Sequence, residues 1–137
     1  MKSDDFDPSF TQIRRTQKAV YDDAWIASFL KKAPVGVLAT SFEDQPFLSP
    51  KMFLYDPDRH AIFMHAADEG RVLTNVQSNP KVCFTAFEMG EIFPGRVARS
   101  FGVKFASVVV FGKIEIVEGD EEVLRVLNAF MQKYAPH

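Results

Sequence analysis

The stretch Ile62-Phe63-Met64-His65-Ala66-Ala67-Asp68-Glu69-Gly70-Arg71-Val72-Leu73 decides the fold expected of this chain. An apolar run ends at His65, a short turn with a glycine follows, and apolar residues then recur at helical spacing up to Asn79-Pro80. The stretch therefore predicts a strand, a turn and a helix over Arg71 to Ser78. The start of such a helix presents backbone N–H groups beside the Arg71 guanidinium, which suits a phosphate group.

The turn itself supports two readings. Asp68 and Glu69 can cap the helix themselves, and their charges would repel a phosphate. Gly70 favours the opposite reading, because a residue without a side chain lets a ligand approach the backbone closely. A phosphate-bearing ligand is therefore a hypothesis, and a solvated arginine at a helix start is its alternative.

The composition is that of one ordinary globular domain. The chain has 137 residues, of which 47% are apolar and 25% charged, and a formal net charge of −2. This length suits a single domain, and the near-neutral charge argues against nucleic acid as a partner. The N-terminus lacks the apolar core of a signal peptide, and no apolar run approaches the roughly 20 residues of a membrane span. We expect a soluble cytoplasmic protein with no membrane partner.

The first half of the chain predicts an arm, a helix and three strands. Residues 1–18 are polar and irregular, and we expect an N-terminal arm, mobile or laid over a partner, followed by one domain over residues 19–137. Asp22 or Asp23 can cap a helix that ends before Pro34. Three apolar runs joined by tight turns then predict an antiparallel meander over Val35–Thr40, Phe47–Tyr55 and Ala61–His65.

The second half predicts a strand over Val82–Phe87, a loop over Met89–Arg99 and a long strand over Val103–Val117. Both faces of that strand are apolar up to Phe111, so the face turned away from the core needs a cover, and a second subunit is the simplest candidate. Gly112 is expected to mark a bulge or bend. Asp120 can cap a last helix, and most of the fourteen phenylalanines are expected to fill the core. The apolar face of that helix is expected to contain Val123, Leu127, Phe130 and Tyr134.

Metal and hydrolase chemistry find little support. His60 and His65 lie an odd number of residues apart on one expected strand, which places them on opposite faces. No Cys-x-x-Cys, His-Glu-x-x-His or Gly-x-Ser-x-Gly element is present. We expect no metal site, and the single cysteine, Cys83, is expected to be a buried, unreactive thiol in a reducing compartment. For His65 a structural role and a role beside the anion site both stay open.

Four blocks, taken in order, resemble the pyridoxamine-phosphate-oxidase-like split-barrel flavoproteins, and within them the nitroimidazole-resistance (Nim) and related flavin-nucleotide-binding proteins. The resemblance covers roughly Trp25 to Tyr134, and the order of the blocks is more specific than any one of them. The blocks are Val37–Thr40, Gln45–Pro50, Ile62–His65 with Glu69-Gly70-Arg71 and Asn79-Pro80, and Ser107–Gly112.

The resemblance implies a mainly β fold, a six-stranded antiparallel split β-barrel with flanking helices. It also implies a homodimer with FMN in two clefts at the subunit interface. Relatives continue past the last helix into another strand, so this barrel either closes differently or lacks that strand.

Site residues follow from the resemblance by position. The strand from Pro50 to Tyr55, with Pro50, Lys51, Met52 and Phe53, would line the flavin ring and ribityl chain, and Lys51 would supply a cation. His65 and Ala66 would flank the flavin, and His65 is the candidate catalytic residue. Arg71 would bind the phosphate, and Val72 stands where the family usually has a lysine. Ser107 would reach the flavin ring from the other subunit.

The function implied is that of an FMN-dependent oxidoreductase acting on a small electrophile such as a nitroaromatic compound. Reduced nicotinamide, NAD(P)H, would be the usual electron donor. The alternative is a dimeric split-barrel protein that binds flavin or haem without turnover, with His65 or His137 as a haem ligand.

Overall fold

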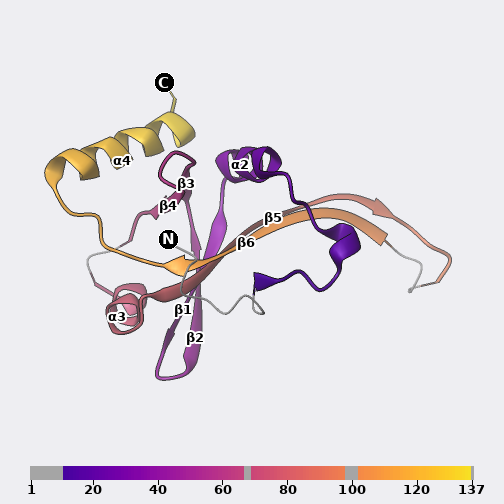
Figure 1. Ribbon diagram of the computed structural model, residues 1–137, viewed down its shortest axis with the longest axis horizontal. Helices are drawn as coiled ribbons and strands as arrows, with labels where there is room; N and C mark the ends of the chain where they lie inside the picture. The colour runs from indigo at the N-terminus through magenta and orange to yellow at the C-terminus, as the bar shows by residue number, and fades with distance from the viewer. Residues whose placement is uncertain (1–10, 67–68, 98–101, 137) are drawn as a thin grey trace.

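The computed structural model describes residues 11–66, 69–97 and 102–136. Within them, six strands form two antiparallel sheets, one with the order β2-β1-β5-β6 and one made of β3 and β4 (Figure 1). The strands are β1 (Gly36–Phe42), β2 (Gln45–Lys51), β3 (Phe53–Asp56), β4 (Ala61–Met64), β5 (Lys81–Phe93) and β6 (Gly102–Lys113).

Four helical segments accompany the sheets: η1 (Thr16–Lys18), α2 (Asp23–Lys32), α3 (Arg71–Ser78) and α4 (Asp120–Tyr134). The side chain of Asp22 accepts the backbone N–H groups of Ala24 at 3.0 Å and Trp25 at 3.2 Å. This N-cap confirms the predicted start of α2, and α3 has the predicted bounds. None of the helices in the described ranges is long and apolar enough to cross a membrane.

The predicted meander is wrong. The run Phe47–Tyr55 is divided at Met52, so that β2 pairs with β1 and β3 pairs with β4 in a separate sheet. The division follows from the backbone of Phe53, whose N–H donates to the hydroxyl of Tyr134 at 3.0 Å. Because β2 is an edge strand, its prolines cost few ladder hydrogen bonds.

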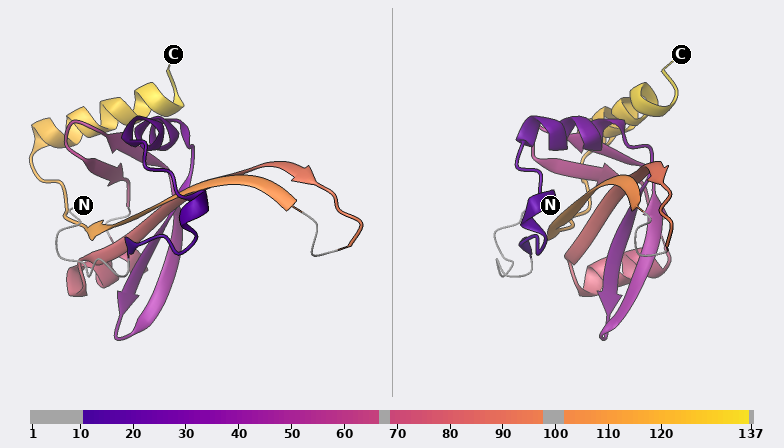
Figure 2. Two further views of the ribbon diagram at one scale, coloured as in Figure 1. Left: turned by 45° about the vertical axis from the view of Figure 1, so that its right-hand side comes forward. Right: turned by 90° about the vertical axis from the view of Figure 1, so that its right-hand side faces the viewer.

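The predicted loop over Met89–Arg99 is also partly wrong, because β5 continues to Phe93, while Arg99 lies outside the described residues. β5 and β6 form a long curved ribbon whose far end projects from the rest of the molecule (Figures 1 and 2). Their register shifts between Met89 and Ile92, whereas Gly112 pairs regularly with Val82 and carries no bulge. Pairing with β6 supplies the hydrogen bonds that keep Met89 to Phe93 extended. β6 itself ends at Lys113, short of the predicted Val117.

The core lies where the two sheets meet α2. The rings of Phe53 and Phe84, both fully buried, pack edge to face with their centres 4.9 Å apart. Partly buried side chains from α3, β4 and β6 pack against the edge of this core. The buried cluster consists of Leu30, Leu38, Phe53, Val82, Phe84 and Ala86.

Helix α4 turns only part of the predicted face inward: Phe130 and Tyr134 are half-buried. Val126 is buried, whereas Val123 and Leu127 are 37% and 44% exposed. Ion pairs join the first turns of this helix to the β3–β4 hairpin: Arg125 lies 3.6 Å from Asp56, and Glu122 lies 3.1 Å from Arg59. Gly119, not Asp120, is the N-cap residue, and Asp120 is the first residue of the helix.

One face of the β5–β6 ribbon is apolar and, within the part of the chain that the structure describes, largely exposed; Lys18 lies 5.3 Å from the centre of its Phe105 ring. Phe87, Met89, Phe105 and Val109 lie on this face, which we call the outer face, and are exposed by 64%, 69%, 58% and 53%. The opposite face carries Phe84, Ala86, Val108 and Val110, which are buried or half-buried. Both faces of β6 are thus apolar, but several phenylalanines lie outside the core, contrary to the expectation that most would fill it.

Candidate functional site

The start of α3 has the geometry expected of an anion site. Gly70 is the N-cap residue, with φ at 129°, a conformation that favours glycine, and it has no side chain to cap the helix. Arg71, the first helical residue, is exposed, and a Cβ at Gly70 would meet no atom within 4 Å. The first turn therefore presents N–H groups and a guanidinium together. Glu69 precedes the N-cap position, and Asp68 lies outside the described residues.

Two side-chain hydrogen bonds fix α3 on β1. The buried amide of Asn75 donates to the hydroxyl of Thr40 at 2.9 Å, and the amide of Asn79 donates to Ser41 at 3.0 Å. Asn75 lies about one turn beyond Arg71. The helix that begins with Arg71 is therefore tied to the four-stranded sheet.

The two segments predicted to contact the flavin ring, Lys51–Phe53 and His65-Ala66, lie at the same end of the β3–β4 sheet. Lys51, at the end of β2, pairs with Gly36, and Phe53, at the start of β3, pairs with Met64. Met52 and His65 are the residues next to this second pair, and both are exposed. The structure thus brings the segment Lys51–Phe53 to the same end of the β3–β4 sheet as His65 and Ala66.

Ser107 lies elsewhere in the same chain. Pro50 pairs with Val37, Val37 with Thr85, and Thr85 with Val109, two residues from Ser107. Three strand spacings, roughly 14 Å, therefore separate the two ends of this row. A single chain does not bring Ser107 to Lys51, and its assignment to the other subunit's site stays a prediction.

The histidines and the cysteine differ in detail from the predictions. His60 lies in the turn between β3 and β4 with φ at 51°, not on a strand with His65, and His137 lies outside the described residues. Among the residues described, no group of three His, Cys, Asp or Glu side chains could hold a metal ion. Cys83 is half-buried, and burial raises the pKa of its thiol.

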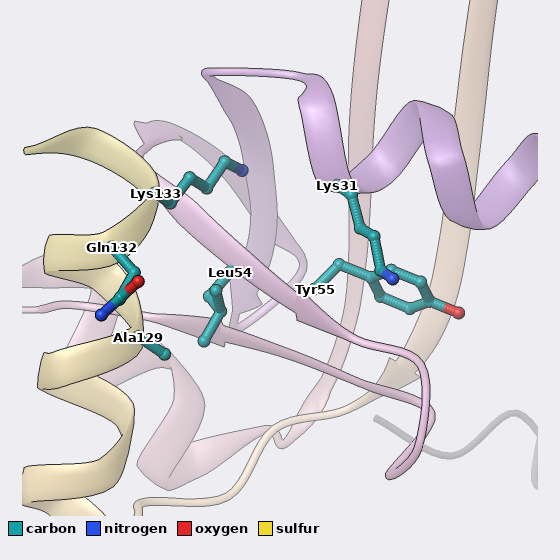
Figure 3. A pocket seen from close by; sticks show the side chains of 6 residues that line it. All are labelled: Lys31, Leu54, Tyr55, Ala129, Gln132 and Lys133. Carbon is teal, nitrogen blue, oxygen red and sulfur yellow. The ribbon is translucent and has the colours of Figure 1, made fainter. Parts of the chain in front are cut away.

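A shallow groove lies between α4, β3 and α2, and none of the residues predicted to bind flavin lines it (Figure 3). Its lining residues are Lys31, Leu54, Tyr55, Ala129, Gln132 and Lys133.

Lys133 lines this groove and Tyr134 follows it in the chain. The sequence placed Tyr134 on the inner face of the helix but predicted no polar contact for either residue. The Lys133 ammonium donates to the carbonyl oxygens of Ala33 and Phe53, both at 2.8 Å, and lies 4.0 Å from the centre of the Phe53 ring. Burial lowers its pKa to about 8. A lysine in the last turn of a helix is common for electrostatic reasons alone, so the sequence carried no signal for these contacts.

The described residues form two antiparallel sheets with helices packed on them, and α3 begins at a glycine followed by an exposed arginine. Residues 22–137 match the family described as pyridoxamine 5'-phosphate oxidase. The chain belongs to this family, which confirms the resemblance drawn from its sequence. No match was found among curated proteins.

Solved structures share the fold at low sequence identity. The flavocytochrome Anf3 from Azotobacter vinelandii superposes with a TM-score of 0.82 at 22% identity over 93% of this chain and 58% of that one. A candidate 5-nitroimidazole antibiotic resistance protein from Bacteroides thetaiotaomicron superposes with a TM-score of 0.74 at 24% identity. The match covers 86% of this chain and 69% of that protein. A FAD and heme binding protein from Mycobacterium smegmatis superposes with a TM-score of 0.76 at 15% identity. The match covers 85% of this chain and 56% of that protein. The chain thus spans little more than half the length of two of these three proteins.

Proposed function

We propose that this protein is a homodimeric FMN-binding oxidoreductase whose two sheets contribute to a split barrel. The family is one of flavin-binding proteins, many of which are flavin-dependent oxidoreductases. The observation that carries the proposal is the start of α3, where Gly70 and the exposed Arg71 provide donors for a terminal phosphate. Glycine at this N-cap leaves room for that phosphate to reach the backbone.

The outer face supports the homodimer. Phe87, Met89 and Phe105 are each more than half exposed, and a patch of this kind on an otherwise ordinary surface is typical of a protein interface. A second copy of the chain would cover it. The same association would bring the partner's β6 toward the segment Lys51–Phe53. Within one chain, three strand spacings, roughly 14 Å, separate Pro50 on β2 from Val109 on β6.

The remaining residues have distinct proposed roles. Lys51 would place a cation, and Pro50, Met52 and Phe53 a largely apolar wall, beside the ring system and the ribityl chain. Bound FMN would supply electron or hydride transfer, with NAD(P)H as donor and a small electrophile such as a nitroaromatic compound as acceptor.

His65 and Ala66, both exposed at the end of β4, would flank the ring, and His65 would hold a proton there. Val72 supplies no charge where relatives carry lysine, so Arg71 bears more of the phosphate contact. Loss of one charge-assisted hydrogen bond, about 1.5 to 3 kcal/mol, would lower affinity by roughly tenfold or more.

A second candidate is binding without turnover. Two of the similar structures are named for haem together with flavin: a flavocytochrome and a FAD and heme binding protein. A dimer that binds flavin or haem for storage, transfer or sensing would use the same fold, with FAD as an alternative to FMN.

The visible spectrum of the purified protein separates these candidates. Two broad flavin bands that bleach on addition of reduced nicotinamide support the oxidoreductase, and chromatography of the released flavin distinguishes FMN from FAD. A flavin spectrum that no donor reduces supports binding alone, and a Soret band supports haem. Protein that stays colourless after incubation with FMN, FAD and haem would contradict both candidates.

A further inference from the structure

The last turn of α4 holds two segments of the chain that are distant in sequence. The Tyr134 hydroxyl accepts the N–H of Phe53 at 3.0 Å, and its proton has two acceptors, the carbonyl oxygens of Pro34 at 2.8 Å and Phe53 at 2.9 Å. Lys133 binds the same two segments, donating to the carbonyl oxygens of Ala33 and Phe53. The peptide groups of Phe53 thus face α4 rather than a neighbouring strand of the larger sheet.

These two segments flank one strand pair. Gly36 follows Ala33 and Pro34 closely, and it pairs with Lys51, which precedes Phe53 by two residues. Tyr134 therefore sets the spacing between the start of β1 and the turn where β2 passes into β3. The exposed Met52 is the single residue between the two strands, so its placement depends on where Phe53 is held.

The rest of α4 secures the same hairpin from its other end. Asp56, at the end of β3, lies 3.6 Å from Arg125, and the Arg125 guanidinium lies 5.5 Å from the centre of the Phe63 ring on β4. The first turns of the helix thus contact the turn of the β3–β4 hairpin, and its last turn places Lys133 and Tyr134 beside Phe53 at the start of β3. Figure 1 shows α4 running beside β3 and β4.

We propose that Lys133 and Tyr134 are positioning residues that set the conformation of Lys51–Phe53 for flavin binding. The inference rests on the proposed function, since it assigns these residues to the same flavin site. Neither side chain touches the flavin. Each acts through the backbone of Phe53, which also anchors the core through its ring against Phe84.

The test combines Tyr134→Phe and Lys133→Met with matched controls. Tyr21→Phe removes a hydroxyl from an exposed tyrosine, and Lys31→Met removes an ammonium from the opposite wall of the groove. Each variant is first shown to be folded by circular dichroism. Amide hydrogen exchange of Phe53 is then measured without flavin, followed by the FMN dissociation constant and the visible circular dichroism of bound FMN.

The expected result is faster exchange at Phe53 in Tyr134→Phe, a dissociation constant raised roughly tenfold in both variants, and an altered visible dichroism of the flavin. The controls should match the wild type. A merely structural role would lower the unfolding temperature but leave the dichroism and the affinity of the folded protein unchanged, and this would overturn the inference. Failure of the wild type to bind FMN would instead remove the proposed function, and the inference with it.

Discussion

The side-chain amide of Asn75 on α3 lies 2.9 Å from the hydroxyl of Thr40 on β1, and both residues are buried. The Asn75 amide oxygen is buried and has no hydrogen-bond partner among the described residues. This hydrogen bond is the buried one of the two that join α3, the helix that begins at Arg71, to β1 in the four-stranded sheet. Its energetic weight should therefore exceed that of an exposed hydrogen bond.

Thr40→Val removes the hydroxyl that accepts the hydrogen bond from the side-chain amide of Asn75. We expect a loss of about 1 to 3 kcal/mol in the free energy of unfolding, measured by urea denaturation. Thr74→Val makes the same change on the exposed side of α3 and should cost less than about 0.5 kcal/mol. Equal midpoints for the two variants would argue that the buried link contributes nothing.

Gly36→Ala should destabilise the core. A Cβ at this buried position would lie 2.1 Å from Cζ of the fully buried Phe84, so ring and strand must shift. Overpacking of this kind costs about 1 to 3 kcal/mol, read from thermal or urea unfolding. Gly102→Ala, where the nearest atom would be 3.9 Å away, is the matched control. Recovery of stability in the double variant with Phe84→Leu would identify the ring as the cause.

Arg71→Ala should lower the affinity for FMN by about tenfold, because one charge-assisted hydrogen bond to the phosphate is lost. Flavin fluorescence during titration gives the dissociation constant. Arg14→Ala removes an exposed arginine from the N-terminal segment and should leave the constant unchanged. If Arg71→Ala retains flavin through purification as the wild type does, Arg71 is not at the phosphate.

Ser107→Arg should give a monomer with little flavin, because it places a charge within the outer face, where covering the guanidinium is unfavourable. Light scattering after size-exclusion chromatography reports the mass, and absorbance reports the flavin. The control Ser78→Arg, at the exposed end of α3, should keep the mass of a dimer and the bound flavin. A monomeric Ser107→Arg protein that still binds FMN would contradict a cleft shared between subunits.

Stability should rise with pH above about 8 through Lys133. Burial lowers the pKa of Lys133 from 10.5 to about 8, so between these values the unfolded chain binds more protons than the folded one. Because the side chain is partly exposed, solvent screening should limit the gain to below about 1 kcal/mol. A neutral amine keeps N–H donors for the carbonyl oxygens of Ala33 and Phe53.

The measurement compares the free energies of unfolding of wild type and Lys133→Met at pH 7.0 and 9.5, two values chosen on either side of the lowered pKa, about 8. The wild type should gain stability relative to the variant at the higher pH. If the difference in the free energy of unfolding between the two proteins stays constant or changes in the opposite direction, burial does not lower the pKa of Lys133.

Several parts of the fold and of the site were predictable from sequence because they depend on neighbouring residues. The bounds of α3, the cap at Asp22 and the position of Gly70 before Arg71 follow from helical spacing and local hydrogen bonds. The family also followed, because its blocks keep their order along the chain.

Other predictions failed where a partner distant in sequence decides the outcome. The run Phe47–Tyr55 is mostly apolar, and its interior residues Ser49, Pro50 and Lys51 do not mark Met52 as the point of division between two sheets. The apolar positions of α4 suggested an inner face of Val123, Leu127, Phe130 and Tyr134. Val123 and Leu127 are exposed, and Glu122 and Arg125 on the same helix form ion pairs with the β3–β4 hairpin. Lys133 had the same local pattern as a solvated lysine.

The sequence by itself determined the helices, the family and the residues that start α3, since these rest on side chains within a few positions of one another. The tertiary structure alone decided which strand each backbone joins, which face of the β5–β6 ribbon stays uncovered, and where Lys133 and Tyr134 bind. The physical reason is that a peptide N–H such as that of Phe53 must find an acceptor, and here the acceptor lies 81 residues further along the chain.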